Sequence, residues 1–252
     1  MHDDFDRTIL DAVDHRPWPL PTTPWVMTQS WHDLLFAHWP VDRADIEAKV
    51  PREFPIDEFG GHAWIGIVPF RLTNVAPRGV PSLPWVSAFP ELNVRTYVRV
   101  ADKPGVYFFS LDAGSVAAVA AARTLLNLPY YPASMTVNEG GTPIEYASER
   151  TAGGNAGFRA TYQPNGTPGI AAAGSLEYFL TERYCLYNLD HRGRPYRLDI
   201  HHRPWLLCGA EASIAFNSMA SANGFTLPGS DPLLHFVRRQ DMVAWVPELL
   251  DQ

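Results

Sequence analysis

Lysine is almost missing from this chain of 252 residues, which has only Lys49 and Lys103. Cysteine is equally scarce: Cys185 and Cys208 can build neither a disulfide framework nor a paired metal-binding spacing, so we expect two reduced thiols in the core. No stretch approaches the roughly 20 apolar residues that a membrane span requires, and the sequence therefore predicts no membrane association.

Basic runs are absent as well. The formal net charge is −7 at pH 7 and the arginines are scattered, which argues against nucleic acid, because nucleic-acid binding needs a concentrated basic surface. The acidic N-terminus, MHDDFDRTIL, lacks the apolar segment of a secretory signal. We therefore expect a cytoplasmic protein with no nucleic-acid partner.

The nine histidines do not show the spacing of metal ligands. His201 and His202 are adjacent and would point to opposite faces of a strand, whereas His32 and His38 would lie about 20 Å apart along one strand. The chain contains no HExxH, GxGxxG or P-loop motif. The sequence therefore predicts no metal site, no nucleotide and no other cofactor.

Proline divides the chain into an arm and one domain. Residues 1–30 contain four prolines, which disfavour regular structure, so we expect an extended proline-rich arm. Trp18 and Trp25 would anchor this arm on the surface or on a partner subunit. Strand-like segments dominate from residue 31 onward without a long linker, and residues 31–252 are predicted to form a single domain.

The segment ELNVRTYVRV, residues 91–100, has the clearest alternation of polar and apolar positions. Its apolar residues would share one face of a strand and its polar residues the other. Two interpretations of the polar face remain open: the lining of a binding site inside a barrel, or an exposed face of a sheet. The polar face consists of Glu91, Asn93, Arg95, Tyr97 and Arg99.

Short strands and a few helices fill the rest of the chain. An alanine-rich helix is expected at 115–127, a short one at 41–50, and a third is favoured at 175–182. The pattern predicts an α+β domain built on a curved, mostly antiparallel β-sheet or barrel with a few short helices. The expected strands are 31–39, 63–70, 91–100, 105–113, 144–150, 157–164, and 183–189 paired with 195–202.

Several segments occur in the order found in the acetoacetate decarboxylase superfamily. KVPREFPID resembles its helix-to-strand segment, and SLDA, Arg123 and Pro129-Tyr130 resemble the stretch that ends in its Schiff-base lysine. LLFAHWPV, FPELNVRTYV, GVYFFSLDA, LPYYPASM, LTERYCLY and HHRPW more closely resemble the YqjF-like family, an uncharacterised bacterial branch of that superfamily, over residues 31–245. The resemblance implies the acetoacetate decarboxylase-like fold, a pocket that includes Glu91, and a homo-oligomer.

The chain departs from the decarboxylases at the position of the Schiff-base lysine, which is Tyr130 here. A Schiff base requires an amine whose pKa is depressed by burial or by a neighbouring cation. Lys49 lies on a predicted helix and Lys103 in a predicted turn, and both are expected to face water. Acetoacetate decarboxylation through a Schiff base is therefore not expected, and the sequence leaves open whether the chain is an enzyme.

Glu91 and Tyr130 are the candidate catalytic residues. A carboxyl in the apolar surroundings expected at Glu91 would have a raised pKa and could act as a general acid or base. An ion pair with Arg95 or Arg123 is the structural alternative. The phenol of Tyr130 could donate a hydrogen bond to a carbonyl or an enolate, or it could simply pack at a loop.

The candidate substrate contacts are mostly arginines. A guanidinium binds a carboxylate through two parallel hydrogen bonds, which favours Arg95 as an anchor. Arg123 has the alternative role of stabilising the C-terminal end of its helix, and Arg183 could instead pair with Glu177 or Glu182. The predicted set is Asn93, Arg95, Tyr97, Arg123 and Arg183.

We therefore expect a pocket that binds or transforms a small oxo acid or a related carbonyl compound without a Schiff-base lysine. If the chain is catalytic, lyase-, hydratase- or isomerase-type acid–base chemistry suits these residues. Its partner would be a small molecule carrying a carbonyl or a carboxylate. The alternative is a non-catalytic ligand-binding or assembly protein with a vestigial pocket.

Overall fold

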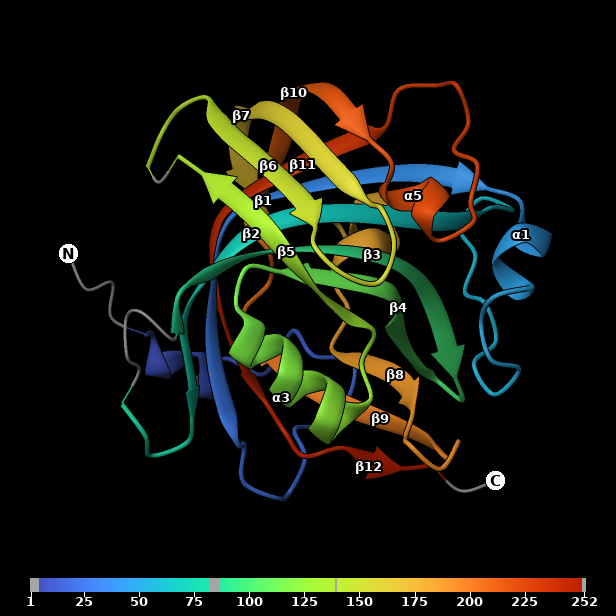
Figure 1. The fold of residues 1–252 in the computed structure, drawn as a ribbon. Helices are drawn as coiled ribbons and strands as arrows, with labels where there is room; N and C mark the ends of the chain where they lie inside the picture. Colours follow the sequence, from blue (N-terminus) through green and yellow to red (C-terminus); the bar gives the residue numbers. More distant parts are fainter. Residues whose placement is uncertain (1–4, 82–86, 139, 251–252) are drawn as a thin grey trace.

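Twelve strands form a single sheet in the computed structural model, which describes residues 5–81, 87–138 and 140–250 (Figure 1). The helices are η1 (Arg7–Asp11, a 3-10 helix), α1 (Arg43–Glu47), α3 (Val116–Leu126), α4 (Leu176–Thr181) and α5 (Met219–Ala222). The strands are β1 (Met27–Val41), β2 (Ala63–Pro77), β3 (Phe89–Val100), β4 (Lys103–Ala113), β5 (Tyr130–Val137), β6 (Ile144–Arg150), β7 (Gly157–Gly169), β8 (Cys185–Leu189), β9 (Pro195–His202), β10 (Leu207–Asn217), β11 (Leu233–Ala244) and β12 (Glu248–Leu249).

The sheet closes on itself twice. Its strand order is β12-β9-β8-β4-β3-β2-β1-β11-β10-β7-β6-β5, and in addition β5 pairs with β4 and β9 pairs with β11. One closed ring therefore contains nine strands and the other seven, with β1, β2, β3, β4 and β11 belonging to both. Among the described strand pairs only β4–β5 and β4–β8 are parallel. The predicted α+β fold with a curved, mostly antiparallel sheet is thus confirmed.

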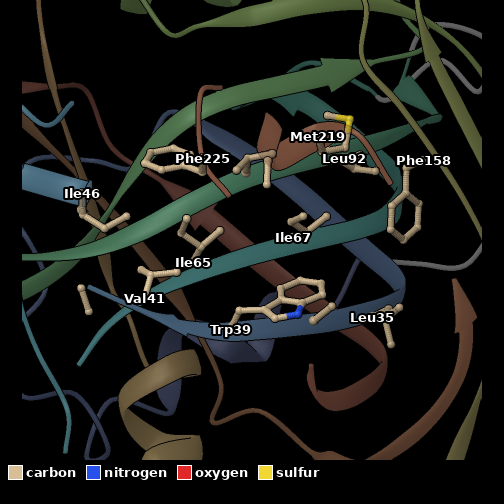
Figure 2. Close-up of a cluster of buried hydrophobic side chains, with 14 of the residues drawn as sticks. Leu35, Trp39, Val41, Ile46, Ile65, Ile67, Leu92, Phe158, Met219 and Phe225 are labelled. Atoms are coloured by element: carbon tan, nitrogen blue, oxygen red, sulfur yellow. The ribbon is translucent and has the colours of Figure 1, made fainter. Parts of the chain in front are cut away.

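Side chains of the shared strands alternate between the interiors of the two rings. On β3, Leu92, Val94 and Val98 are fully buried in the largest hydrophobic cluster, together with residues of β6 and β7. The intervening residues of β3, beginning with Glu91, face the seven-stranded ring. Figure 2 shows part of the large cluster, with Leu35, Trp39, Val41, Ile46, Ile65, Ile67, Leu92, Phe158, Met219 and Phe225.

Helix α3 lies beside the β8–β9 hairpin. It begins after Ser115, whose Oγ accepts a hydrogen bond from the backbone N–H of Ala118 at 3.3 Å. It ends at Asn127, which adopts the left-handed conformation with φ of 50°. The Asn127 side chain donates to the carbonyl of Leu189 on β8 at 2.9 Å, which ties the end of the helix to the sheet.

The N-terminal arm packs against its own chain. Ile9 is buried in a small cluster at the end of β11. Trp18 donates its indole N–H to the Asp199 carboxylate at 3.0 Å, and the Arg78 guanidinium lies 4.9 Å from the Trp25 ring centre. Both tryptophans therefore anchor the arm on the surface of the same molecule, and β1 already begins at Met27.

A buried ion pair spans the closure of the nine-stranded ring. Arg150 on β6 donates to both carboxylate oxygens of Asp112 on β4, at 2.7 and 3.0 Å. The side chains are 3% and 0% exposed, so this pair is shielded from water. Because β5 lies between β4 and β6, the pair reaches across β5, where the Tyr131 ring lies 3.8 Å from the Arg150 guanidinium.

Replacing Arg150 with Met should therefore destabilise the fold severely, because it leaves the Asp112 charge buried without a partner. We expect a loss of roughly 3–5 kcal/mol in the free energy of unfolding, measured by denaturant titration. Arg43→Met is the matched control, since it breaks only exposed ion pairs with Glu47 and Glu58 and should change stability little. Equal losses in the two variants would contradict this account of the ring closure.

Candidate functional site

A cavity of about 280 Å³ is enclosed by the seven-stranded ring and α3. All seven strands of that ring contribute residues to its lining. Its mouth lies beside α3, because Ala121 and Leu125 both line the cavity and are exposed. Most of the wall is apolar, and its aromatic members are Trp31, Phe36, Phe70, Phe89, Phe108 and Trp205.

Three polar residues of the lining come from β3. Glu91, Asn93 and Arg95 all line the cavity, and they are only 5%, 5% and 9% exposed. The structure therefore places the polar positions from Glu91 to Tyr97 inside a ring rather than on an exposed sheet face, whereas Arg99 at the end of the segment is exposed.

Glu91 and Tyr130 are brought together in the cavity. Tyr130 donates its phenolic proton to Oε2 of Glu91 at 3.0 Å. Among the described residues Glu91 forms no ion pair, so the pairing with Arg95 or Arg123 considered from the sequence is not observed. Tyr131 points the other way, toward Arg150. With its single proton used on Glu91, Tyr130 positions that carboxyl rather than presenting a free donor to a ligand.

Burial shifts the proton affinities of this pair. It raises the pKa of Glu91 from its ordinary 4.5 to about 8, an effect that the Tyr130 hydrogen bond opposes and the Asp112 charge reinforces. Burial and the adjacent Glu91 also raise the pKa of Tyr130 well above 10.0. Glu91 can therefore gain and lose a proton near neutral pH, whereas Tyr130 keeps its proton.

Arg95 is a buried cation without a carboxylate partner. Its Nη2 donates to the carbonyl of Leu180 at 3.0 Å, and its guanidinium lies 5.2 Å from the Phe36 ring centre. Within the described residues, its Nε is buried and forms no hydrogen bond, and Oδ1 of Asn93 is likewise without a partner. No ion pair among the described residues includes Arg95. Since an unpaired buried charge is costly, an anionic ligand would complement this end of the cavity.

Tyr97 does not line the cavity, and its ring packs against Arg95, whose guanidinium lies 5.5 Å from the ring centre. Its hydroxyl donates a hydrogen bond to the carbonyl of Leu180 at 2.8 Å. The same hydroxyl must therefore accept a hydrogen bond from Nε2–H of His38, which lies 2.6 Å away. Burial, and then the charge of Arg95, hold the pKa of His38 well below 6.5 and keep the ring neutral. Gly66 leaves room for both side chains, because a Cβ there would lie 3.1 Å from the His38 ring and 3.3 Å from Arg95 Cγ.

The other two predicted arginines differ in placement. Arg183 lines the cavity, but its Nη1 donates to Asp57 at 2.7 Å and its Nε to the Phe179 carbonyl at 2.6 Å. Its carboxylate partner is therefore Asp57 and neither of the glutamates considered from the sequence. Arg123 does not line the cavity. It is exposed in the last turn of α3, where its positive charge interacts favourably with the helix dipole.

No amine lines the cavity in the described part of the chain. Lys49 is exposed, and Lys103 lies with its Nζ 5.6 Å from the Trp18 ring centre. The same ranges contain no group of three or more His, Cys, Asp or Glu side chains placed to hold a metal ion. Cys185 and Cys208 are buried free thiols. Within the described residues, no helix is long and apolar enough to cross a membrane.

The aromatic wall of the cavity was missed by the sequence reasoning. Trp31 and Trp205 stack with ring centres 5.6 Å apart, and Phe36 meets Trp205 edge-on at 5.2 Å. These residues come from β1 and from the segment before β10, which are far apart in the chain. A single aromatic residue in an apolar segment carries no signal that distinguishes a cavity wall from a solid core.

Known structures share this fold. The acetoacetate decarboxylase of Legionella pneumophila subsp. pneumophila str. Philadelphia 1 superposes with a TM-score of 0.62 at 13% identity, covering 96% of this chain and 95% of that one. The enduracididine biosynthesis enzyme MppR complexed with pyruvate gives 0.61 at 12% identity, with 91% of each chain covered. An acetoacetate decarboxylase-like enzyme from Sphingomonas wittichii RW1 gives 0.61 at 11% identity, covering 94% and 98%. The chain therefore has the acetoacetate decarboxylase-like fold.

Sequence similarity is much higher to one protein of the predicted YqjF-like family. The chain is 49% identical over 226 residues to the uncharacterized protein YqjF of Bacillus subtilis (strain 168), which covers 90% of this chain and 93% of that protein. A family model described as DUF2071, uncharacterized conserved protein, matches residues 28–241. The chain belongs to this DUF2071 family of uncharacterized conserved proteins.

Proposed function

We propose that the cavity binds a small carboxylic acid carrying a carbonyl group and that Glu91 exchanges a proton with it. The observation that carries this proposal is Glu91 itself, a buried carboxyl hydrogen-bonded by Tyr130, with no cation partner among the described residues and a pKa raised to about 8. The ketone or aldehyde would lie beside Glu91, and the carboxylate would bind Arg95.

The fold supports this ligand class by analogy. MppR has been seen with pyruvate bound, and acetoacetate decarboxylases share the architecture. The Schiff-base route is not proposed for this chain, because neither lysine lines the cavity in its described part.

Glu91 is suited to move a proton to and from the carbon next to the carbonyl. In its ionised form it would take that proton, the C–H electron pair would form the C=C bond of an enolate, and the carbonyl π pair would move onto the oxygen. After the Glu91 proton has exchanged with solvent, Glu91 would return a proton to the carbon and restore the carbonyl. A carboxylate with a pKa of about 8 is a stronger base than an ordinary one. Tyr130 would hold the carboxyl in place during the transfer.

Glu91→Gln should abolish this proton transfer. Exchange of hydrogen for deuterium next to the carbonyl can be followed by proton NMR in deuterated water, over a panel of oxo acids of increasing chain length. We expect the unaltered chain to accelerate exchange of a bound acid, and the variant to lose about 100-fold or more of that rate. The rate should rise with pH and level off above about 8, as Glu91 becomes ionised.

The folded variant should still bind the acid, which separates loss of chemistry from loss of the pocket. Binding without accelerated exchange in the unaltered chain would instead contradict the acid–base role and favour a ligand-binding protein.

Arg95→Met should weaken binding of the carboxylate, because it removes the unpaired guanidinium. A charged hydrogen bond of roughly 1.5–3 kcal/mol corresponds to a loss of about tenfold or more in affinity, which calorimetry can measure. Arg123→Met is the matched control, since that side chain is exposed and does not line the cavity. Unchanged affinity in a folded Arg95→Met protein would show that the carboxylate binds elsewhere.

The raised pKa of Glu91 also predicts a pH dependence of stability. Between about pH 5 and pH 8 the unfolded chain has released the Glu91 proton while the folded chain keeps it, so the free energy of unfolding falls as pH rises. Gln cannot ionise, and the stability of Glu91→Gln relative to the unaltered chain should therefore increase over this range, by at most about 1.4 kcal/mol per pH unit. Denaturant titrations at several pH values measure this difference, and a difference that is independent of pH would refute the shift.

A further inference from the structure

The two polar ends of the cavity are far apart along β3. Glu91 and Arg95 are four residues apart on one face of the strand, and they pair in unbroken register with Phe70 and Gly66 of β2. At a rise of about 3.3 Å per residue, their Cα atoms lie roughly 13 Å apart.

The Arg95 side chain extends along β3 away from Glu91, so its guanidinium lies further from Glu91 than the Cα atom of Arg95 does. Its Nη2 and the hydroxyl of Tyr97 both donate to the carbonyl of Leu180, at 3.0 and 2.8 Å, and Tyr97 lies two residues further along β3.

The Arg95 end has an excess of positive charge. Arg183 also lines the cavity there, and the carboxylate that it uses, Asp57, is shared with Arg99. Among the described residues, Arg95 and Arg183 line this end of the cavity with one carboxylate partner between them, whereas the Arg99 side chain is exposed. A carboxylate ligand would bind here more favourably than beside Glu91, which is itself an acidic group with no ion-pair partner among the described residues.

The stretch between the two ends is apolar on most sides. Val68 of β2 lies opposite Asn93 in the register, and Phe36 and Phe70 line the cavity near its two ends. Asn93 is the polar group halfway along, and its Oδ1 has no partner. A cavity of about 280 Å³ with these walls would hold a compact hydrocarbon chain or ring.

A ligand that reaches both ends needs a wide separation between its polar groups. Taking the carboxyl and the guanidinium to be as far apart as their Cα atoms, about 13 Å, and allowing a hydrogen bond of about 2.9 Å at each end, roughly 7 Å remains between its carboxylate and its carbonyl. In a 2-oxo acid these groups sit on adjacent carbons, only about 1.5 Å apart.

We infer that the ligand is an elongated monocarboxylic acid, whose carboxylate binds Arg95 and whose carbonyl meets Glu91 at the far end of an apolar chain or ring. This assignment of the ligand class rests on the proposed function, and it excludes short 2-oxo and 3-oxo acids as the best ligands. The apolar spacer lies between the aromatic walls, and the mouth beside α3 admits it.

A series of five probes tests this on the unaltered full chain by calorimetry. The probes are 7-oxooctanoate, octanoate, 2-octanone, acetoacetate and pyruvate. We expect 7-oxooctanoate to bind about tenfold or more tightly than any of the others, because it alone satisfies both ends and the apolar walls. Arg95→Met should weaken its binding to the level of 2-octanone, whereas the matched control Arg123→Met should not.

The possible outcomes distinguish failure of the ligand class alone from failure of the proposed function. Pyruvate or acetoacetate binding as tightly as 7-oxooctanoate would overturn the elongated ligand and leave the proposed function standing. Equal affinities for octanoate and 7-oxooctanoate would also overturn it, since the distal carbonyl would then contribute nothing. If no oxo acid in the series binds, the ligand class and the proposed function fail together.

Discussion

Five strands of the sheet belong to two closed rings at once, and this constraint organises the molecule. Both faces of β1, β2, β3, β4 and β11 must be covered, so successive side chains on each strand serve different interiors. On β3, Leu92 and Val94 fill the core of the nine-stranded ring while Glu91 and Arg95 face the cavity of the other ring. The large core thereby holds the polar residues of the cavity on a rigid strand.

Burial then gives the two ends of the cavity opposite characters. Burial favours the neutral form of Glu91, and the carboxylate of Asp112 adds to this effect, whereas the hydrogen bond from Tyr130 opposes it. Arg95 lies at the same end as Arg183 and has no carboxylate partner among the described residues, and both Arg95 and Tyr97 donate to the carbonyl of Leu180. The proposed proton-exchanging residue and the proposed anion-binding residue thus lie on the same strand, separated by apolar walls.

Much of the fold and part of the site could be predicted from the sequence. The alternation of residues 91–100 correctly grouped Glu91, Asn93 and Arg95, because a strand of period two leaves little freedom in which side chains share a face. Alternation alone could not decide whether that face was buried, since exposed faces have the same pattern. The double closure of the sheet depends on contacts between distant segments, such as β5 with β4 and β9 with β11, and it has no local signature.

At three individual positions the sequence did not show where the side chain lies or what it binds, and each case has a physical cause. Arg123 sits on an alanine-rich helix with little amphipathic character, so the sequence did not show that its side chain faces water. Tyr97 shares the face of Arg95, but the close packing of His38 and Leu180 around it ends the cavity before it is reached. The partner of Arg183 is Asp57, from a loop more than a hundred residues earlier, which spacing along the chain could not indicate.

The central claim is that Glu91 is a buried carboxyl that keeps its proton at neutral pH. Its titration can be observed directly by carbon NMR of protein carrying carboxyl-labelled glutamate, with the Glu91 signal assigned by its absence in Glu91→Gln. The account predicts that this one glutamate changes its carboxyl shift near pH 8, whereas exposed glutamates do so near their ordinary value of 4.5. A Glu91 signal that titrates together with the exposed glutamates would contradict it.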